Sequence, residues 1–119
     1  MAMKRKHLLY DLWLADEAID TLAYVGLWPD LLQTAAAYSG AKIIGKQFHQ
    51  FEPQGVTGFL LLAESHISIH TWPEENLITL DIFTCGNLEI DILLDYLRTE
   101  LKPVKEKLTI VARGEASES

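Results

Sequence analysis

The fold of this chain is decided by Glu64-Ser65-His66-Ile67-Ser68-Ile69-His70-Thr71-Trp72-Pro73-Glu74, a stretch that reads as a strand with two unlike faces. Successive side chains of a strand point to opposite faces, so Ile67 and Ile69 share one face, and the other carries His66, Ser68, His70 and Trp72. Histidines beside hydroxyl groups are suited to proton transfer. The simpler alternative is the solvated face of a half-buried strand, which is ordinarily polar.

The sequence on both sides of this stretch reads as strands in succession with a few helical segments. Apolar runs predict further strands over residues 7–15, 42–51, 56–63, 77–84 and 105–111. Helical spacing and terminal signals predict helices over residues 16–24, 29–38 and 88–101. This order of elements predicts an α+β fold, a two-layer sandwich of a largely antiparallel sheet with helices on one face.

Several single residues fix the ends of these elements. Pro29 suits the first turn of its helix, and Pro103 closes the last helix. Asn87 belongs to the residue types that cap a helix N-terminus, so we expect it to cap the helix over residues 88–101. The lysines of residues 105–111 predict an edge strand, and the polar residues 113–119 predict a disordered tail.

Length and composition limit the class of protein. The 119 residues suit a single domain over 1–119, and 49% hydrophobic residues are enough for a core, although a permanent partner would help so small a chain to bury surface. A net charge of −7 without a basic patch argues against nucleic acid as a partner. Asp11 and Asp16 interrupt the apolar residues after the N-terminus, so neither a signal peptide nor a membrane span is predicted. Cys85 is the only cysteine, which excludes an internal disulfide and favours the reducing cytoplasm.

Four motifs, in order along the chain, resemble those of the small prokaryotic S-adenosylmethionine decarboxylases, which make their own pyruvoyl cofactor. They are His7-Leu8-Leu9-Tyr10-Asp11-Leu12, Phe48-His49-Gln50-Phe51-Glu52-Pro53-Gln54-Gly55-Val56-Thr57-Gly58, the stretch from Glu64 to Glu74, and Asp81-Ile82-Phe83-Thr84-Cys85-Gly86. The resemblance runs from His7 to Gly86 and is weak over residues 15–30. It implies the same two-layer sandwich that the order of elements predicts.

The resemblance implies self-cleavage between Glu64 and Ser65, which would give a β chain of residues 1–64 and an α chain of residues 65–119. The Ser65 hydroxyl would attack the Glu64 carbonyl carbon, a step that needs a strained backbone and a donor to the oxyanion. A base would then remove the α-proton of Ser65, and hydrolysis would leave a pyruvoyl group. His70 matches this processing base. Thr57 stands where a serine is usual, keeps the hydroxyl, and would support processing.

The pyruvoyl group made from Ser65 is the cofactor that the resemblance implies; it would form a Schiff base with the substrate and accept the electrons released with CO₂. Cys85 matches the acid that protonates the resulting carbanion, although a lone cysteine is more commonly a small buried hydrophobe. Phe51, Trp72 and Glu74 match residues that bind the nucleoside, with core packing or a solvated turn as their alternatives. No metal is implied. The family precedent is a homodimer of cleaved protomers with the sites at the interface.

These residues predict an enzyme, an S-adenosylmethionine decarboxylase proenzyme whose product is the aminopropyl donor for spermidine synthesis. The same machinery would serve a decarboxylase of arginine or ornithine, because the processing motif does not select the substrate. A non-catalytic binding or regulatory homologue, left unprocessed, would have no need of Ser65, His70 and Cys85 together. A cysteine hydrolase using Cys85 and His70 ranks last, because no nucleophile elbow or oxyanion loop is recognisable.

Overall fold

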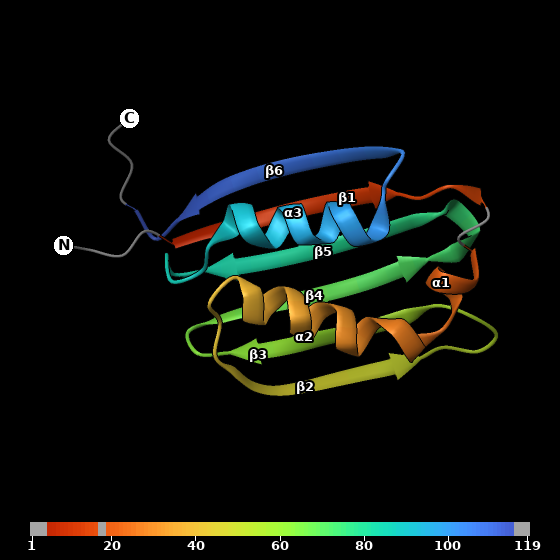
Figure 1. Cartoon of the computed structure of the whole chain (residues 1–119), viewed down its shortest axis with the longest axis horizontal. Helices are drawn as coiled ribbons and strands as arrows, with labels where there is room; N and C mark the ends of the chain where they lie inside the picture. The colour runs from red at the N-terminus through yellow and green to blue at the C-terminus, as the bar shows by residue number, and fades with distance from the viewer. Residues whose placement is uncertain (1–4, 17–18, 116–119) are drawn as a thin grey trace.

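The computed structural model describes residues 5–16 and 19–115 and arranges them as a six-stranded antiparallel sheet with helices on one face (Figure 1). The strands are β1 (Arg5–Trp13), β2 (Ile43–Gln50), β3 (Val56–Leu62), β4 (Ser65–Trp72), β5 (Leu77–Thr84) and β6 (Lys105–Arg113). The helices are α1 (Ile19–Ala23), α2 (Trp28–Tyr38) and α3 (Ile90–Leu101), with short 3₁₀ turns η2 (Val25–Leu27) and η3 (Pro73–Glu75). This arrangement confirms the predicted α+β two-layer sandwich.

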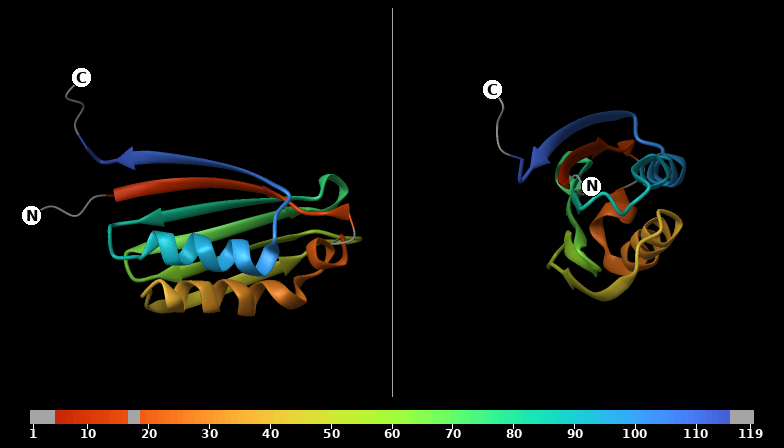
Figure 2. Two further views of the ribbon diagram at one scale, coloured as in Figure 1. Left: turned by 45° about the horizontal axis from the view of Figure 1, so that its top comes forward. Right: turned by 90° about the vertical axis from the view of Figure 1, so that its left-hand side faces the viewer.

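The strand order is β2-β3-β4-β5-β1-β6, and each neighbouring pair is antiparallel. Successive hairpins build the sheet from β2 to β5, while β1 is placed between β5 and β6 by long connections. The predicted edge strand, β6, pairs only with β1 among the described strands. In the end-on view of Figure 2, α2 and α3 lie on the same side of the sheet.

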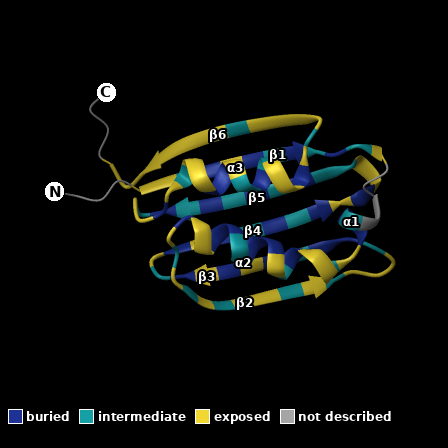
Figure 3. Ribbon diagram, in the orientation of Figure 1, coloured by how far each residue is buried: buried dark blue, intermediate teal, exposed yellow. Residues whose placement is uncertain are grey.

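The alternation predicted for β4 holds residue by residue, and Figure 3 shows the same buried and exposed banding along the strands. Ile67 and Ile69 face the helices and are buried, whereas His66 and Trp72 are exposed on the other face. The helices close the core with apolar stripes. The buried members are Trp28, Leu31, Leu32, Ala35 and Ala36 on α2, and Leu93, Leu94, Leu97 and Leu101 on α3.

The structure corrects the predicted start of the last helix. The helix α3 begins at Ile90, and its N-cap residue is Glu89, which makes no side-chain capping bond. The side chain of Asn87 is instead hydrogen-bonded to the turn between β3 and β4, so it cannot cap the helix. Strand β6 extends to Arg113, the first residue of the expected tail. Residues 116–119 of that tail, and residues 17–18 of the helix expected over 16–24, lie outside the described residues.

Candidate active site

The predicted cleavage point is a two-residue turn between β3 and β4. Leu62 and Ser65 face each other across the ladder, and Ala63 and Glu64 connect them. The φ angle of Glu64 is 64°, in the left-handed region that side-chain-bearing residues seldom adopt. Such a conformation costs roughly 1–3 kcal/mol and persists only where surrounding contacts hold it. The backbone strain expected at the cleavage point is therefore present on the acyl side of the Glu64–Ser65 peptide bond.

The segment that follows β5 supplies the contacts that hold this turn. The Cys85 thiol donates to the Glu64 carbonyl oxygen at 2.8 Å, and the Asn87 side-chain amide donates to the Ala63 carbonyl oxygen at 3.1 Å. Ser65 is only 6% exposed, and its hydroxyl donates to Asn87 Oδ1 at 3.0 Å. Cys85 itself is partly exposed. One end of the sheet thus groups the expected nucleophile, the carbonyl that it would attack and the expected acid.

A second group of predicted site residues gathers at the other end of β3 and β4. Thr57 and His70 face each other across the ladder, with Thr57 Oγ1 and His70 Nδ1 2.9 Å apart. They border a pocket of about 270 Å³ that also takes in Phe51, Trp72 and Glu74. Phe51 and Trp72 are 46% and 42% exposed, so neither is a core residue. The remaining lining residues are Gln54, Gly55, Val56, Thr71 and Pro73.

These two groups are not brought together within a single chain. Ser65 and His70 are five residues apart on β4, and a strand rises about 3.3 Å per residue, so they are separated by about 16 Å along it. An odd spacing also puts them on opposite faces: Ser65 lies on the helix-covered face and His70 on the other. A proton transfer needs heavy atoms about 3 Å apart. This separation follows directly from the five-residue spacing of Ser65 and His70 on a single strand.

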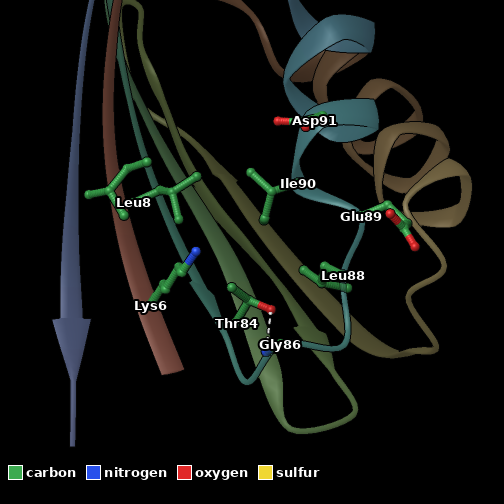
Figure 4. A pocket seen from close by; sticks show the side chains of 9 residues that line it. Lys6, Leu8, Thr84, Gly86, Leu88, Glu89, Ile90 and Asp91 are labelled. Atoms are coloured by element: carbon green, nitrogen blue, oxygen red, sulfur yellow. Dashed lines mark hydrogen bonds between the residues drawn. The ribbon is translucent and has the colours of Figure 1, made fainter. Parts of the chain in front are cut away.

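A second pocket, of about 370 Å³, lies on the helix side of the segment after β5 (Figure 4). It contains no residue predicted for the site. Its lining combines apolar residues with one ammonium and two carboxylate side chains: Lys6, Leu8, Thr84, Gly86, Leu88, Glu89, Ile90, Asp91 and Ile110. Figure 4 also shows the Thr84 side chain beside Gly86, whose backbone amide donates to Thr84 Oγ1 at 3.1 Å.

Neither a metal-binding cluster nor a membrane-spanning helix occurs within residues 5–16 and 19–115. Over these ranges, histidine, cysteine and acidic side chains do not gather in threes that could hold a metal ion. In the same part of the chain, every helix is too short or too polar to cross a membrane.

Asn87 is the residue at this site whose position sequence reasoning missed. Its type suggested a helix cap, and no local pattern indicates that it reaches back to Ala63 and Ser65. The contact arises because β4 and β5 are paired up to His66 and Phe83, which leaves the end of β5 beside the β3–β4 turn.

Comparison with known proteins gives consistent matches over nearly the whole chain. A family model described as S-adenosylmethionine decarboxylase matches residues 6–114. The S-adenosylmethionine decarboxylase proenzyme of Methanococcus aeolicus is 44% identical over 111 residues, covering 92% of each chain. A second such proenzyme, from Bacillus cereus, is 40% identical over 111 residues, covering 92% of this chain and 88% of the relative. The crystal structure of the adenosylmethionine decarboxylase from Aquifex aeolicus superposes with a TM-score of 0.85 at 37% identity, covering 100% of this chain and 98% of that one.

Proposed function

The chain belongs to the S-adenosylmethionine decarboxylase family, and from this premise we propose that it is a self-cleaving proenzyme that decarboxylates S-adenosylmethionine. The products are CO₂ and decarboxylated S-adenosylmethionine, the aminopropyl donor for spermidine. One observation carries the proposal. The Glu64 carbonyl combines a strained backbone with a thiol donor 2.8 Å from its oxygen, immediately before a buried serine hydroxyl.

This geometry suits the first step of self-cleavage. Ser65 Oγ forms a bond to the Glu64 carbonyl carbon, the bond from that carbon to the Ser65 nitrogen breaks, and the hydroxyl proton ends on the freed amine. Negative charge develops on the carbonyl oxygen, where the Cys85 thiol already donates a hydrogen bond. The ester would link Glu64 to Ser65 through the longer path over Oγ and Cβ, which would let the left-handed φ of Glu64 relax and so favours the ester.

The next step needs a base at the Ser65 α-proton, and we assign it to His70 of a second copy of the chain. Within one copy, about 16 Å of strand separates the two residues, so His70 cannot act on its own Ser65. A two-fold axis makes contacts reciprocal. An axis that brings the Ser65 end of one copy to the His70 end of the other therefore completes two sites at once. Thr57, 2.9 Å from His70 Nδ1, keeps the imidazole oriented.

The uncovered face of the sheet supports this homodimer. Both long helices lie on the opposite face, and no described element covers this one (Figure 2). Leu9, Phe59 and Leu61 project from β1 and β3 on the uncovered face and are 38–46% exposed. Exposed apolar groups in such a patch are typical of surfaces that bind another protein. Packing two such faces would bury these side chains and bring strand ends of both copies together. Ser65 is the first residue of β4, so the partner's His70 would reach its α-carbon around the end of the strand and not through the sheet.

The same site suits the decarboxylation. A pyruvoyl group at position 65 would supply the electron-accepting carbonyl. The exposed rings of Phe51 and Trp72 present faces that suit a purine or a sulfonium ion, and the Glu74 carboxylate borders the same pocket. Cys85 would deliver a proton to the substrate carbon after CO₂ has left. Because Cys85 must remain a free thiol for this role, a reducing compartment such as the cytoplasm suits the enzyme.

Two measurements test the proposal. The intact mass of purified protein should correspond to chains of 64 and 55 residues, the second beginning with a pyruvoyl group instead of an amine. Release of labelled CO₂ from carboxyl-labelled S-adenosylmethionine should then follow the cleaved fraction. Labelled arginine and ornithine, run beside it, test the alternative substrates. Turnover by fully uncleaved protein would exclude the pyruvoyl mechanism, and turnover of an amino acid alone would change the substrate.

Residues 15–30 resemble the family only weakly, yet they support the pocket lined by Phe51, Trp72 and Glu74. The alternative substrates are therefore worth testing. The carbonyl oxygen of Ala23 accepts hydrogen bonds from the Gly55 amide and from Gln50 Nε2, both at 2.8 Å. The Leu22 carbonyl oxygen accepts one from Thr71 Oγ1 at 2.7 Å. The segment therefore fixes the turn that lines the proposed nucleoside pocket, and an unusual sequence there is the feature most able to alter its shape.

A further inference from the structure

We propose that Asn87 positions the Ser65 hydroxyl for attack on the Glu64 carbonyl, a role that rests on the self-cleavage proposed above. The side chain of Asn87 makes three hydrogen bonds around the turn. Its Oδ1 accepts from Ser65 Oγ at 3.0 Å and from Thr84 Oγ1 at 3.3 Å, and its Nδ2 donates to the Ala63 carbonyl oxygen at 3.1 Å. Two of these partners, Ala63 and Ser65, belong to the turn that contains the expected cleavage point, more than twenty residues from Asn87 in the sequence.

The directions of these bonds are fixed by chemistry. The Ala63 carbonyl oxygen can only accept, so Nδ2 of Asn87 must face it and Oδ1 must face the hydroxyl groups. Thr84 Oγ1 accepts from the Gly86 amide and therefore has its own proton free to donate to Oδ1. Ser65 must likewise donate its proton to Oδ1. The hydroxyl of Ser65 is thus held in one orientation, with its lone pairs directed away from Asn87.

Asn87 and Cys85 together also fix the acyl side of the bond. Asn87 holds the carbonyl of Ala63 and Cys85 holds the carbonyl of Glu64, so both residues of the turn are tied to the same segment. A left-handed φ at Glu64 persists only when its surroundings impose it. The same residue therefore constrains the carbonyl side of the turn and aligns the nucleophile. This use of its side chain also accounts for the start of α3 at Ile90.

The step that Asn87 assists transfers an acyl group and requires no further reactant. The bond from Ser65 Oγ to the Glu64 carbonyl carbon forms, the peptide bond breaks, and the hydroxyl proton passes to the amine. Asn87 neither gains nor loses a proton. Its contribution is orientation, so a variant that keeps only the acceptor oxygen should stay much closer to the wild-type rate than a variant that keeps neither group.

The test measures the rate at which newly synthesised chains leave the amide state. Samples are quenched in denaturant with hydroxylamine, which cleaves the ester, so ester and pyruvoyl products both count as having passed the acyl shift. We expect Asn87→Ala to slow this step by about 10²-fold and Asn87→Asp, which keeps an acceptor for Ser65, to remain within about tenfold of wild type. Gln33→Ala is the matched control, because it also loses a side-chain amide bond of 3.0 Å but lies on α2. It should cleave at the wild-type rate.

The outcomes separate the two proposals. Asn87→Ala cleaving at the wild-type rate, or Asn87→Asp as slow as Asn87→Ala, would overturn the positioning role while leaving self-cleavage intact. If wild type itself yields no fragments, the proposed function fails instead. Melting temperatures are measured on the same samples, and a loss of stability with an unchanged rate per folded molecule assigns Asn87 to structure alone. Asn87→Leu, which has similar size and no acceptor, replaces the alanine variant should that one not fold, with the same slow rate expected.

Discussion

Mixing two inactive variants should restore self-cleavage, because in the proposed homodimer each chain contributes a different half of the site. The first variant, Ser65→Ala, keeps His70 but has no nucleophile. The second, His70→Ala, keeps the nucleophile but has no base. In a mixed dimer, the Ser65 of the second chain meets the His70 of the first, and that site is intact. The other site of the same dimer lacks both groups.

The size of the effect follows from the geometry. About 16 Å of strand lies between Ser65 and His70 in one chain, against a reach of about 3 Å for proton transfer, so no rescue can occur within a chain. Equal amounts of two chains that pair at random form mixed dimers half of the time, so about half of the His70→Ala chains should be cleaved. Neither variant alone should give a pyruvoyl chain.

The assay is intact mass spectrometry after co-expression, with a short tag on one variant to distinguish the chains. The matched control replaces the first variant by the double variant Ser65→Ala/His70→Ala, which supplies no histidine at that position to either site. We expect cleavage with the single variant and none with the double variant. Equal cleavage in the two mixtures would refute the trans arrangement. So would the absence of cleavage in a mixture shown by its tags to contain mixed dimers.

Three further predictions concern single residues. Cys85→Ser should still cleave itself but release CO₂ about 10²–10⁴-fold more slowly per processed chain, because a hydroxyl is a far weaker acid than a thiol. Normal turnover with a lowered melting temperature would assign Cys85 to packing. Gly58→Ala should lower the free energy of unfolding by about 1–3 kcal/mol in a urea titration, because a Cβ there would lie 2.1 Å from the Phe48 ring. Tyr10→Phe removes the hydroxyl that donates to Glu106 at 2.5 Å and should cost about 0.5–1.5 kcal/mol. Burial, and then the Glu106 hydrogen bond, raise the pKa of Tyr10. Above about pH 10 only the unfolded tyrosine ionises, so the stability of the wild type should fall as the pH rises. The phenylalanine variant should lack this slope.

Matched controls exist for two of these changes. Gly45→Ala adds the same atom to β2, where nothing lies within 4 Å of the new Cβ, so it should change stability little. An unchanged melting curve for Gly58→Ala would contradict the close approach of the Phe48 ring. Tyr38→Phe alters a tyrosine that is 61% exposed and should keep the wild-type dependence on alkaline pH. A similar slope in Tyr10→Phe and wild type would disprove the role given to the buried hydroxyl.

Much of the fold could be predicted from the sequence because it depends on local periodicity. Alternation along residues 65–72 gave the two faces of β4, since backbone geometry alone points neighbouring side chains in opposite directions. Helical spacing gave the stripe of leucines that α3 buries. Pro29 falls in the first turn of α2, as its fixed φ requires. The motif stretches likewise contain each residue that was expected to do chemistry.

The tertiary structure decided which of those residues meet. The sequence by itself predicted the strands and the helix faces, because these rest on spacing along one element, and the resemblance of its motifs nominated Ser65, His70 and Cys85 as candidates. Only the pairing of β4 with β5 brought Cys85 to the Glu64 carbonyl, and the same pairing drew Asn87 away from the helix that it was expected to cap. These contacts of Cys85 and Asn87 join residues more than twenty positions apart, so they depend on strand order and register, which no local pattern contains.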